Sequence, residues 1–509
     1  MHPALRTLPR SLLLAGLACF GPTVALGQII DVRTIPVATG DQFFLFPSAR
    51  AGMGGVAVAL DDSLLDPFVN PAKGANIGAA QMFGSPMFYN ITHNDGSART
   101  LPLGVLLHSP TWFGGGLVAL QQLVAPQSPF VYPVPMLAGA DVAYPYGQDL
   151  LSDRVRRNMY GFAFLGRTFG RTALAASVFW GGLNAMDGVD QLYPGSQSID
   201  QYGHIVDYRL GLLRDLGGGR SLSLLGLHDR VTMTQDVTYT YYTLVPCPIP
   251  PDTVPTSCPT PQTRTDHNLD WTRTWGLHAQ YQQPFTGTGW RIGGVLTGNY
   301  KTHPHIPNYA LMNVPRDPGH SWAFEVGPGI ARSSGPTTFG MDVLFQPIWS
   351  HTWAATTSGD TITTTDSRFS FSNVVMRMGV AQEIRPVQIQ LGLAVRSIDY
   401  VMHQWVSSSP AAIAYAIQQA TDRRQHESWM EWTPTWGVSV ALPGLSLRYV
   451  GRLTTGTGRP GVASGWPTIA GGVAVPLAGG DYVVAPSGPL TLQDATVITN
   501  QVSVVLPIR

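Results

Sequence analysis

Charged residues are scarce in this chain of 509 residues. The 31 Lys and Arg residues and the 31 Asp and Glu residues together make up 12% of the sequence, whereas a soluble domain typically contains about 25%. The two signs are also equal in number, so the chain lacks the basic surplus of a nucleic-acid-binding protein. We therefore expect no nucleic-acid partner, and a charge-poor protein that is not an ordinary soluble domain.

Long apolar runs are also missing. After residue 27 no run reaches about 18 apolar residues, so no membrane-spanning helix is expected. The first 27 residues have the pattern of a secretory signal peptide: Arg6 and Arg10, an apolar stretch at 11–21 and a small-residue cleavage site at 25–27. An N-terminal anchor helix is the alternative, but the apolar stretch is short for a span. We expect residues 1–27 to be removed on export.

Cysteine is nearly absent, with three residues in the chain. Cys19 falls within the expected signal peptide. Cys247 and Cys258 bracket a proline-rich loop, and in an exported protein such a pair is expected to form a local disulfide. A metal site would need further ligands nearby, so we expect none.

The sequence is rich in alternating apolar and polar residues. In residues 387–396, for example, Val387 and Ile389 share one face, while Gln388 and Gln390 share the other. A period of two with one apolar face is typical of a strand. The same alternation recurs in residues 271–283, 429–442 and 445–453.

These strands are about 10 residues or longer, the length that a tilted strand needs to cross a bilayer. Tight turns such as Pro443-Gly444 alternate along the chain with long polar loops, which is the plan of an outer-membrane β-barrel. A soluble β-sandwich or propeller explains the alternation but not the strand length or the scarcity of charge. We expect an all-β, single antiparallel barrel in the bacterial outer membrane. The count is 16 strands if 81–91 and 99–109 both belong to the wall, and 14 if one early pair does not.

Residues 49–77, "ARAGMGGVAVALDDSLLDPFVNPAKGANI", fit neither a spanning helix nor a wall strand. Their small apolar half suits close packing inside a barrel, and Asn70-Pro71 is a helix-start signature that predicts a short turn from Pro71 to Asn76. The segment is either a connector or a plug folded into the lumen. We divide the mature chain into a hatch at 28–78 and a barrel at 79–509.

The same segment resembles the N-terminal signature of the FadL-type and PorV/PorQ-type outer-membrane barrels. In that superfamily a small-residue, Met-Gly-Gly-containing stretch precedes an acidic stretch and then Asn-Pro-Ala. The matching residues include Met53, Gly54, Gly55, Asp61, Asp62, Asn70, Pro71 and Ala72. Lys73, directly after Asn-Pro-Ala, favours the PorV-type branch.

The resemblance implies a barrel of 14 strands with an N-terminal hatch in its lumen. It also implies one of two functions. FadL-type members pass hydrophobic small molecules, and PorV-type members serve type IX secretion by binding exported proteins at the cell surface. We expect uptake or binding of a hydrophobic small molecule, with the secretion platform as the alternative.

Charged residues within the strands are expected to point into the lumen, because a charge on the lipid face near the bilayer midplane costs about 2–4 kcal/mol. We expect Asp61 and Asp62 to meet some of the lumen arginines and so hold the hatch in place. The predicted lumen charges are Asp207, Arg209, Arg396, Glu431, Arg448 and Arg452.

Motifs for catalysis are sparse, and no nucleophile elbow or Ser-His-Asp order is present. We therefore expect no enzymatic activity and no cofactor. The expected partners are outer-membrane lipid, a hydrophobic small-molecule ligand and, under the alternative, secretion-system or exported proteins.

Overall fold

The computed structural model describes residues 40–94, 96–124, 155–187, 198–246, 257–303, 319–358, 361–410, 419–460 and 492–508. The expected signal peptide and Cys247 lie outside these residues. So do the hatch residues before Gly40.

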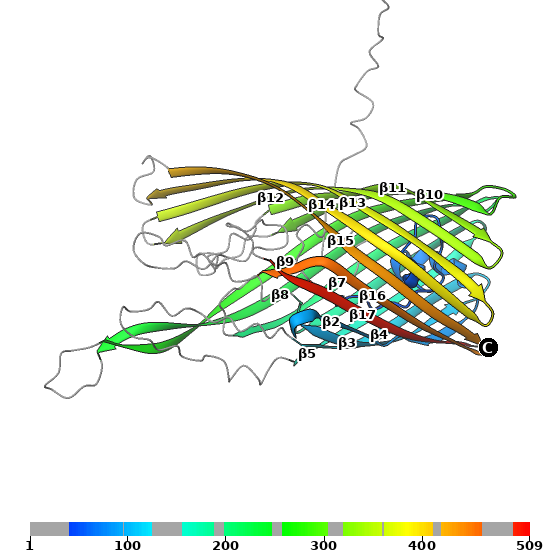
Figure 1. The fold of residues 1–509 in the computed structure, drawn as a ribbon, viewed down its shortest axis with the longest axis horizontal. Helices are drawn as coiled ribbons and strands as arrows, with labels where there is room; N and C mark the ends of the chain where they lie inside the picture. The colour runs from blue at the N-terminus through cyan, green and yellow to red at the C-terminus, as the bar shows by residue number, and fades with distance from the viewer. Residues whose placement is uncertain are drawn as a thin grey trace, which may run out of the picture.

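Nearly all of the described chain is β-strand, and Figure 1 shows the strands as one tilted, cylindrical wall. The chain also has four short helices, three of them before the first strand: η1 (Ala51–Met53), α1 (Asp66–Val69), η2 (Pro71–Asn76) and η3 (Thr92–Asn94). None of the described helices is long and apolar enough to cross a membrane. The strands are β1 (Gln81–Gly84), β2 (Met87–Ile91), β3 (Ser97–His108), β4 (Trp112–Val124), β5 (Val155–Phe169), β6 (Thr172–Leu183), β7 (Ser198–Gly217), β8 (Arg220–Pro246), β9 (Ser257–Pro284), β10 (Trp290–His303), β11 (Gly319–Ser334), β12 (Thr337–Ser358), β13 (Thr361–Ile384), β14 (Val387–Pro410), β15 (Gln419–Leu442), β16 (Leu445–Pro460) and β17 (Leu492–Pro507).

The wall is closed and antiparallel. Consecutive strands from β3 to β9 and from β10 to β17 pair with each other, and β9 lies beside β10. Closure is completed by β1 and β2, which both pair with β17 on one side and with β3 on the other. A closed sheet leaves no strand edge unpaired, as a membrane requires.

β1 and β2 are two halves of one wall strand. Gln81 lies opposite Pro507 and Met87 opposite Gln501, so the register on β17 does not shift across the break. Proline at position 86 cannot donate to the ladder, but its carbonyl still accepts from Val502 N–H at 2.9 Å. The barrel therefore has 16 wall strands. The expected count of 14 is wrong, because the early segments at 81–91 and 99–109 both pair in register within the wall.

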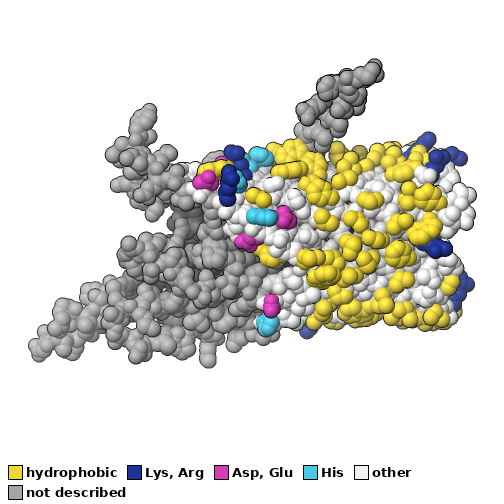
Figure 2. Space-filling model, turned by 45° about the horizontal axis from the view of Figure 1, so that its top comes forward, with side chains coloured by type: hydrophobic (Ala, Val, Ile, Leu, Met, Phe, Trp, Pro, Cys, Tyr) yellow, Lys and Arg dark blue, Asp and Glu magenta, His cyan; other side chains and the backbone are white. Residues whose placement is uncertain are grey.

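The two faces of the wall differ as the alternation predicts. Outward side chains are apolar and exposed, for example Val118, Leu210 and Leu391, and Figure 2 shows them as a continuous band around the visible face. Inward side chains include many buried polar groups, such as Asp207 and Glu325. An apolar exterior around a polar lumen is the pattern of a transmembrane barrel. The fold is that of an outer-membrane β-barrel.

Short turns gather at one end and long strand extensions at the other. The C-terminus lies at the short-turn end (Figure 1), where glycines with positive φ such as Gly335 and Gly444 form tight turns. At the opposite end β8 and β9 continue as a hairpin well past the wall (Figure 1). We call this the loop end.

Candidate functional site in the barrel lumen

Residues 40–78, called the N-terminal segment from here on, lie against the inward face of the wall. The segment begins near the loop end, where the Gln42 amide donates to Ala185 O at 3.0 Å and Gln121 Nε2 donates to Gln42 O at 2.6 Å. It then runs toward the short-turn end, and η1 and η2 contact different parts of the wall. The segment is thus held by strands that are far apart in sequence.

Asp62 organises the turn between the two halves of the segment. Its buried carboxylate accepts from Ser48 Oγ at 2.6 Å and from the backbone N–H groups of Ala49 and Arg50 at 2.8 and 3.1 Å. It also accepts from Leu64 N–H at 3.0 Å. This carboxylate closes a loop within the segment itself and forms no ion pair with the predicted lumen arginines in the described residues.

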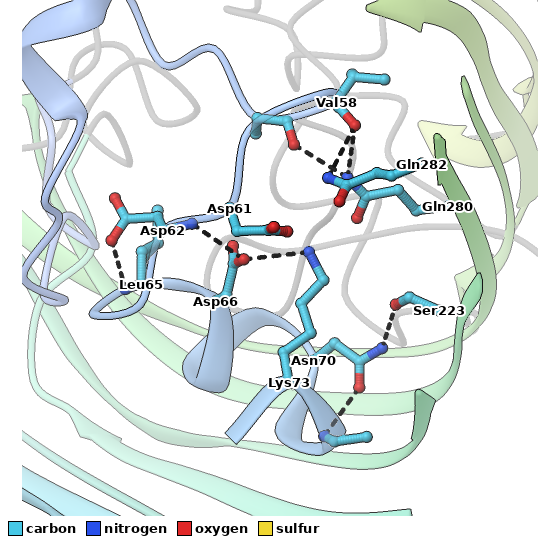
Figure 3. A network of polar contacts seen from close by, with 12 residues as sticks. Val58, Asp61, Asp62, Leu65, Asp66, Asn70, Lys73, Ser223, Gln280 and Gln282 are labelled. Carbon is cyan, nitrogen blue, oxygen red and sulfur yellow. Dashed lines mark hydrogen bonds and ion pairs between the residues drawn. The ribbon is translucent and has the colours of Figure 1, made fainter. Parts of the chain in front are cut away.

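Asp66 and Lys73 form a buried ion pair beside this loop (Figure 3), with Nζ 3.2 Å from Asp66 Oδ2. The same oxygen accepts from Asp62 N–H at 3.1 Å. Burial raises the pKa of the Asp66 carboxyl to about 6, although the Lys73 ammonium acts in the opposite direction. The pair therefore loses its charge on Asp66 when the pH falls below about 6.

Asp61 meets an arginine that the sequence does not single out. Its carboxylate lies 2.8 Å from Arg291 Nη1 on β10, and both side chains are about one-third exposed. Asp61 was expected to meet one of the predicted lumen arginines, and its ion-pair partner in the structure is Arg291 instead.

Backbone atoms of residues 57 and 58 are held by polar side chains of the wall. Asp342 on β12 accepts from Ala57 N–H at 2.8 Å and from Val58 N–H at 3.2 Å. On β9, Gln280 and Gln282 donate to Val58 O at 3.0 and 3.1 Å (Figure 3). Sequence reasoning missed Asp342, although its inward position in an alternating strand was a usable signal.

Inward glycines of the wall lie directly beneath residues 52–58. A Cβ at Gly392 would lie 2.1 Å from Gly54 N, and one at Gly379 would lie 2.3 Å from Met53 O. Such distances leave no room for any side chain. Thr435 Oγ1 completes the contact, accepting from Gly54 N–H at 2.9 Å and donating to Gly52 O at 3.0 Å. We call this surface the glycine seat; its members are Gly293, Gly329, Gly340, Gly379, Gly392 and Gly437, one from each strand from β10 to β15.

The Met-Gly-Gly motif fits this surface for a backbone reason. Gly54 and Gly55 have φ values of 72° and 75°, which disfavour any residue with a Cβ. Met53 is fully buried next to them. The motif thus places a tight left-handed turn against the wall.

The Asn-Pro-Ala motif anchors the other half of the segment. Asn70 is the N-cap of η2, and its Oδ1 accepts from Ala72 N–H at 3.1 Å, as predicted for this pair of residues. Its Nδ2 donates to Ser223 Oγ on β8 at 2.7 Å (Figure 3). Ala72 is fully buried, and a Cβ at Gly211 would lie 2.0 Å from Asn70 Oδ1.

Helices α1 and η2 pack on apolar side chains of the wall, which we call the apolar bed. Phe68 is 1% exposed and stacks on Phe46, with ring centroids 4.6 Å apart. Its ring also lies 5.2 Å from that of Phe162 and 6.3 Å from that of Phe164. The bed comprises inward residues of β3–β7: Leu106, Phe113, Leu117, Ala119, Tyr160, Phe162, Phe164, Ala173, Ala175, Phe179 and Ile205.

Two of the predicted lumen charges bind the segment from the wall. Asp207 and Arg209 on β7 are buried and pair at 3.0 Å. The Arg209 guanidinium also donates to the carbonyls of Phe68 and Val69, at 3.1 and 2.6 Å, at the end of α1. One ion pair therefore satisfies the terminal carbonyls of the short helix.

The other predicted lumen charges are placed as follows. Arg396 and Glu431 lie across adjacent strands, 3.8 Å apart. Arg452 lies 3.4 Å from Asp41, which belongs to the N-terminal segment. Arg448 lines a cavity beside the segment. The predicted disulfide is not described, since Cys247 lies outside the described residues.

Two cavities adjoin the segment on its short-turn side; the larger is mainly polar, and the smaller is polar and apolar in about equal parts. One of about 630 Å³ is lined by residues that include Arg50, Lys73 and Arg448. The other, of about 400 Å³, is lined by residues that include Arg171 and Arg291. Asp61, Lys73 and Asn76 border both cavities. In the part of the chain that the structure describes, no group of three or more His, Cys, Asp or Glu residues is arranged to hold a metal ion.

The sequence matches no protein-family model and no curated protein sequence. Among solved structures the fold is similar to a FadL homologue of Pseudomonas aeruginosa, with a TM-score of 0.39 and 10% identity over 94% of this chain and 100% of that one. It is also similar to a bacterial polysaccharide outer membrane secretin, with a TM-score of 0.35, 8% identity, and coverage of 85% and 99%. The ferric-catecholate import receptor of E. coli matches with a TM-score of 0.34, 8% identity, and coverage of 84% and 82%. Likenesses this weak assign no ligand and no activity to this chain.

Proposed function

We propose that the protein lies in the bacterial outer membrane and binds or passes hydrophobic small molecules through its lumen, with residues 40–78 as the hatch. The observation that supports it best is a buried cluster of inward-facing, mainly aromatic side chains, called the aromatic surface, on the loop side of the N-terminal segment. The apolar exterior supports the membrane placement, and the contacts of the segment with both sides of the wall support its closing role.

The aromatic surface is formed by side chains from β11 to β15. Phe371 and Tyr400 lie with ring centroids 5.4 Å apart, and Tyr400 stacks on Trp429 at 5.5 Å. These residues alternate along their strands with outward residues such as Val374 and Val401, which are exposed. The surface consists of Ala323, Ile348, Phe369, Phe371, Tyr400, Met402 and Trp429. Ring faces of this kind bind apolar molecules by area burial and stacking.

The route through the protein is axial under this proposal. The wall register runs without a shift across Ser85–Pro86, between β17 and β3, so the described pairings there leave no sideways gap. The larger cavity beside residues 49–76 is mainly polar, whereas aromatic side chains gather on the loop side. Along this axial route the aromatic surface is on the loop side of the hatch.

Binding of an apolar fluorescent probe tests the proposal. We expect Phe371→Ala to weaken binding of N-phenyl-1-naphthylamine to the detergent-solubilised barrel by about tenfold, equivalent to about 1.4 kcal/mol. The matched control is Val374→Ala, an outward residue of the same strand. Equal affinities in the two variants would contradict the proposed ligand class.

A platform for exported proteins is the second candidate, and the length of β8 and β9 favours it. These strands have 27 and 28 residues, whereas about 9–11 residues cross a bilayer. The excess projects beyond the wall at the loop end (Figure 1). Mass spectrometry of proteins that co-purify with the intact chain, and with a chain lacking residues 240–262, distinguishes the two candidates. Loss of a secreted protein on shortening the hairpin would support the platform.

A further inference from the structure

Five adjacent strands place a basic side chain at the same register position. His320 on β11 lies opposite His351 on β12, and His351 lies opposite Arg368 on β13. Arg368 then lies opposite His403 on β14, which lies opposite Arg424 on β15. These five residues, called the basic row, come from positions spread over about a hundred residues of sequence, and only the strand register aligns them.

The basic row faces outward, away from the lumen. Four members lie next to buried inward residues, such as Phe369 and Met402, which are at most 3% exposed, and Arg424 has the strand parity of the exposed residue Met430. Figure 2 shows His, Asp and Lys or Arg side chains gathered at the loop-end edge of the apolar band. The row therefore borders the part of the wall that faces lipid.

The basic row is inclined to the membrane, so its β15 end lies farther from the membrane than its β11 end. At its β11–β12 end, His320 and His351 are each one outward position from Trp322 and Trp349, tryptophans of the kind that mark a membrane interface. At its β15 end, Arg424 lies three outward positions beyond the exposed apolar residue Met430.

Strand spacing and tilt give the dimensions of the row. Four intervals of about 4.8 Å make it about 19 Å long. A strand tilt of about 40° inclines the row to the membrane plane, so its two ends differ in height by about 12 Å. This rise exceeds the roughly 5–7 Å depth of one phospholipid headgroup layer.

Acidic side chains lie beside the row, but the guanidinium groups of its two arginines keep hydrogen-bond donors that these acids do not occupy. Asp366 contacts two of its members, with 2.8 Å to His351 Nε2 and 3.5 Å to Arg368 Nε. The Arg368 guanidinium, 63% exposed, also lies over the Trp405 ring at 5.2 Å. Arg424 has no ion pair with another described residue. Two further outward acids are nearby: Asp399, which is paired with His426 at 3.0 Å, and Asp422.

We propose that the basic row binds the phosphorylated head of a glycolipid that stands upright against β11–β15. Guanidinium groups bind phosphate oxygens through paired hydrogen bonds, and imidazoles supply further donors. A partner that meets basic groups at several heights must have anionic groups at several heights, which a glycolipid with a phosphorylated sugar head offers and a single phospholipid headgroup does not. The site rests on the membrane placement proposed above and not on passage of any ligand.

Binding of rough lipopolysaccharide to the detergent-solubilised barrel tests this site. We expect the double variant Arg368→Ser, Arg424→Ser to bind it about tenfold more weakly than the unaltered chain, a loss in the range expected for two solvent-exposed charge contacts. The matched control is Arg332→Ser. Arg332 lies over Trp290 at 5.3 Å, the same arrangement at the short-turn end, and its replacement should leave the affinity unchanged.

Two further measurements identify the ligand chemistry. Enzymatically dephosphorylated lipopolysaccharide should bind the unaltered chain more weakly than intact lipopolysaccharide does. Its affinity should be no higher than that of intact lipopolysaccharide for the double variant. Vesicles of phosphatidylglycerol should compete weakly. Equal binding of the dephosphorylated glycolipid, equal competition by phosphatidylglycerol, or an unchanged double variant would each overturn the proposal. Probe binding at the aromatic surface, tested with Phe371→Ala, should be the same in the double variant, so failure of the two proposals is distinguishable.

Discussion

The two halves of the N-terminal segment are held by different combinations of contacts. Residues 64–77 insert large side chains into the apolar bed, where Phe68 is almost completely buried. Residues 49–62 instead lay their backbone on the glycine seat and are fixed by hydrogen bonds to Asp342, Gln280 and Thr435. Residues 64–77 are held mainly by area burial. Residues 49–62 combine close backbone approach and these hydrogen bonds with smaller apolar contacts, in which Met53, Val56 and Leu60 are buried beside Ala331 and Ala381. Release of residues 49–62 would therefore not require residues 64–77 to unpack.

The largest expected effect comes from emptying the apolar bed. Phe68→Ala removes a ring that contacts Phe46, Phe162 and Phe164, and a buried Phe→Ala change typically costs about 3–5 kcal/mol. The loss is measurable as a lower denaturant midpoint for the barrel in detergent micelles. Phe88→Ala, an outward residue that is half exposed, is the control. A midpoint equal to that of the control would show that the bed contributes no stability.

The second effect is a pH dependence of stability that comes from Asp66, in the half of the segment that packs on the apolar bed. The pKa of Asp66 is about 6 in the folded protein against an ordinary value of 3.8, so the folded state retains a proton that the unfolded chain has lost. This group favours folding below about pH 4, and the contribution falls by up to about 3 kcal/mol as the pH rises to about 6.

Asp66→Asn removes that titration. The difference in unfolding midpoint between the unaltered chain and this variant should therefore shift between pH 4 and 6, with the unaltered chain losing stability as the pH rises. Midpoints that run parallel across the whole window would refute the assignment.

The third effect tests the glycine seat with neighbouring residues. A Cβ at Gly293 would lie 2.3 Å from Val58 O, whereas one at Gly294 would have nothing within 4 Å. Gly293→Leu should therefore displace residues 57 and 58, at a cost of about 1–3 kcal/mol, and raise the leak conductance in planar bilayers. Gly294→Leu should do neither. Equal conductance in the two variants would mean that closure does not depend on the seat.

The smallest effect is expected at the Asp61–Arg291 pair. Both side chains are partly exposed, and such pairs typically contribute about 0–1 kcal/mol. Arg291→Ala should shift the unfolding midpoint by less than any change above. A large loss of stability would show that the glycine-seat half is held by charge rather than by backbone approach.

Much of the fold could be predicted from local pattern. The period of two in residues 387–396 predicts a strand with one outward apolar face, and the structure has Ile389 and Leu391 exposed there. Asn70-Pro71 predicts the start of η2 correctly, since N-capping depends on neighbouring residues alone. The strand count was less accessible, because Pro86 interrupts the first strand and only its pairing with β17 shows that it belongs to the wall.

The candidate site was less predictable, because its contacts join residues far apart in sequence. Arg291 and Asp342 each contact the segment across more than 200 positions. The glycines of the seat are ordinary strand glycines in sequence, and only the path of residues 52–58 shows why a Cβ would clash there. The basic row depends on the register of five strands, and a slip of one residue in any of them would turn its member into the lumen.

The sequence by itself determined that this chain forms long amphipathic strands with an apolar outer face, and that residues 49–77 differ from them. These properties follow from side-chain polarity at a fixed local period. The tertiary structure decided the number of wall strands, the different attachments of the two halves of the segment, and the alignment of the basic row. Each of these depends on which strands become neighbours and in what register, which closure of the whole sheet sets.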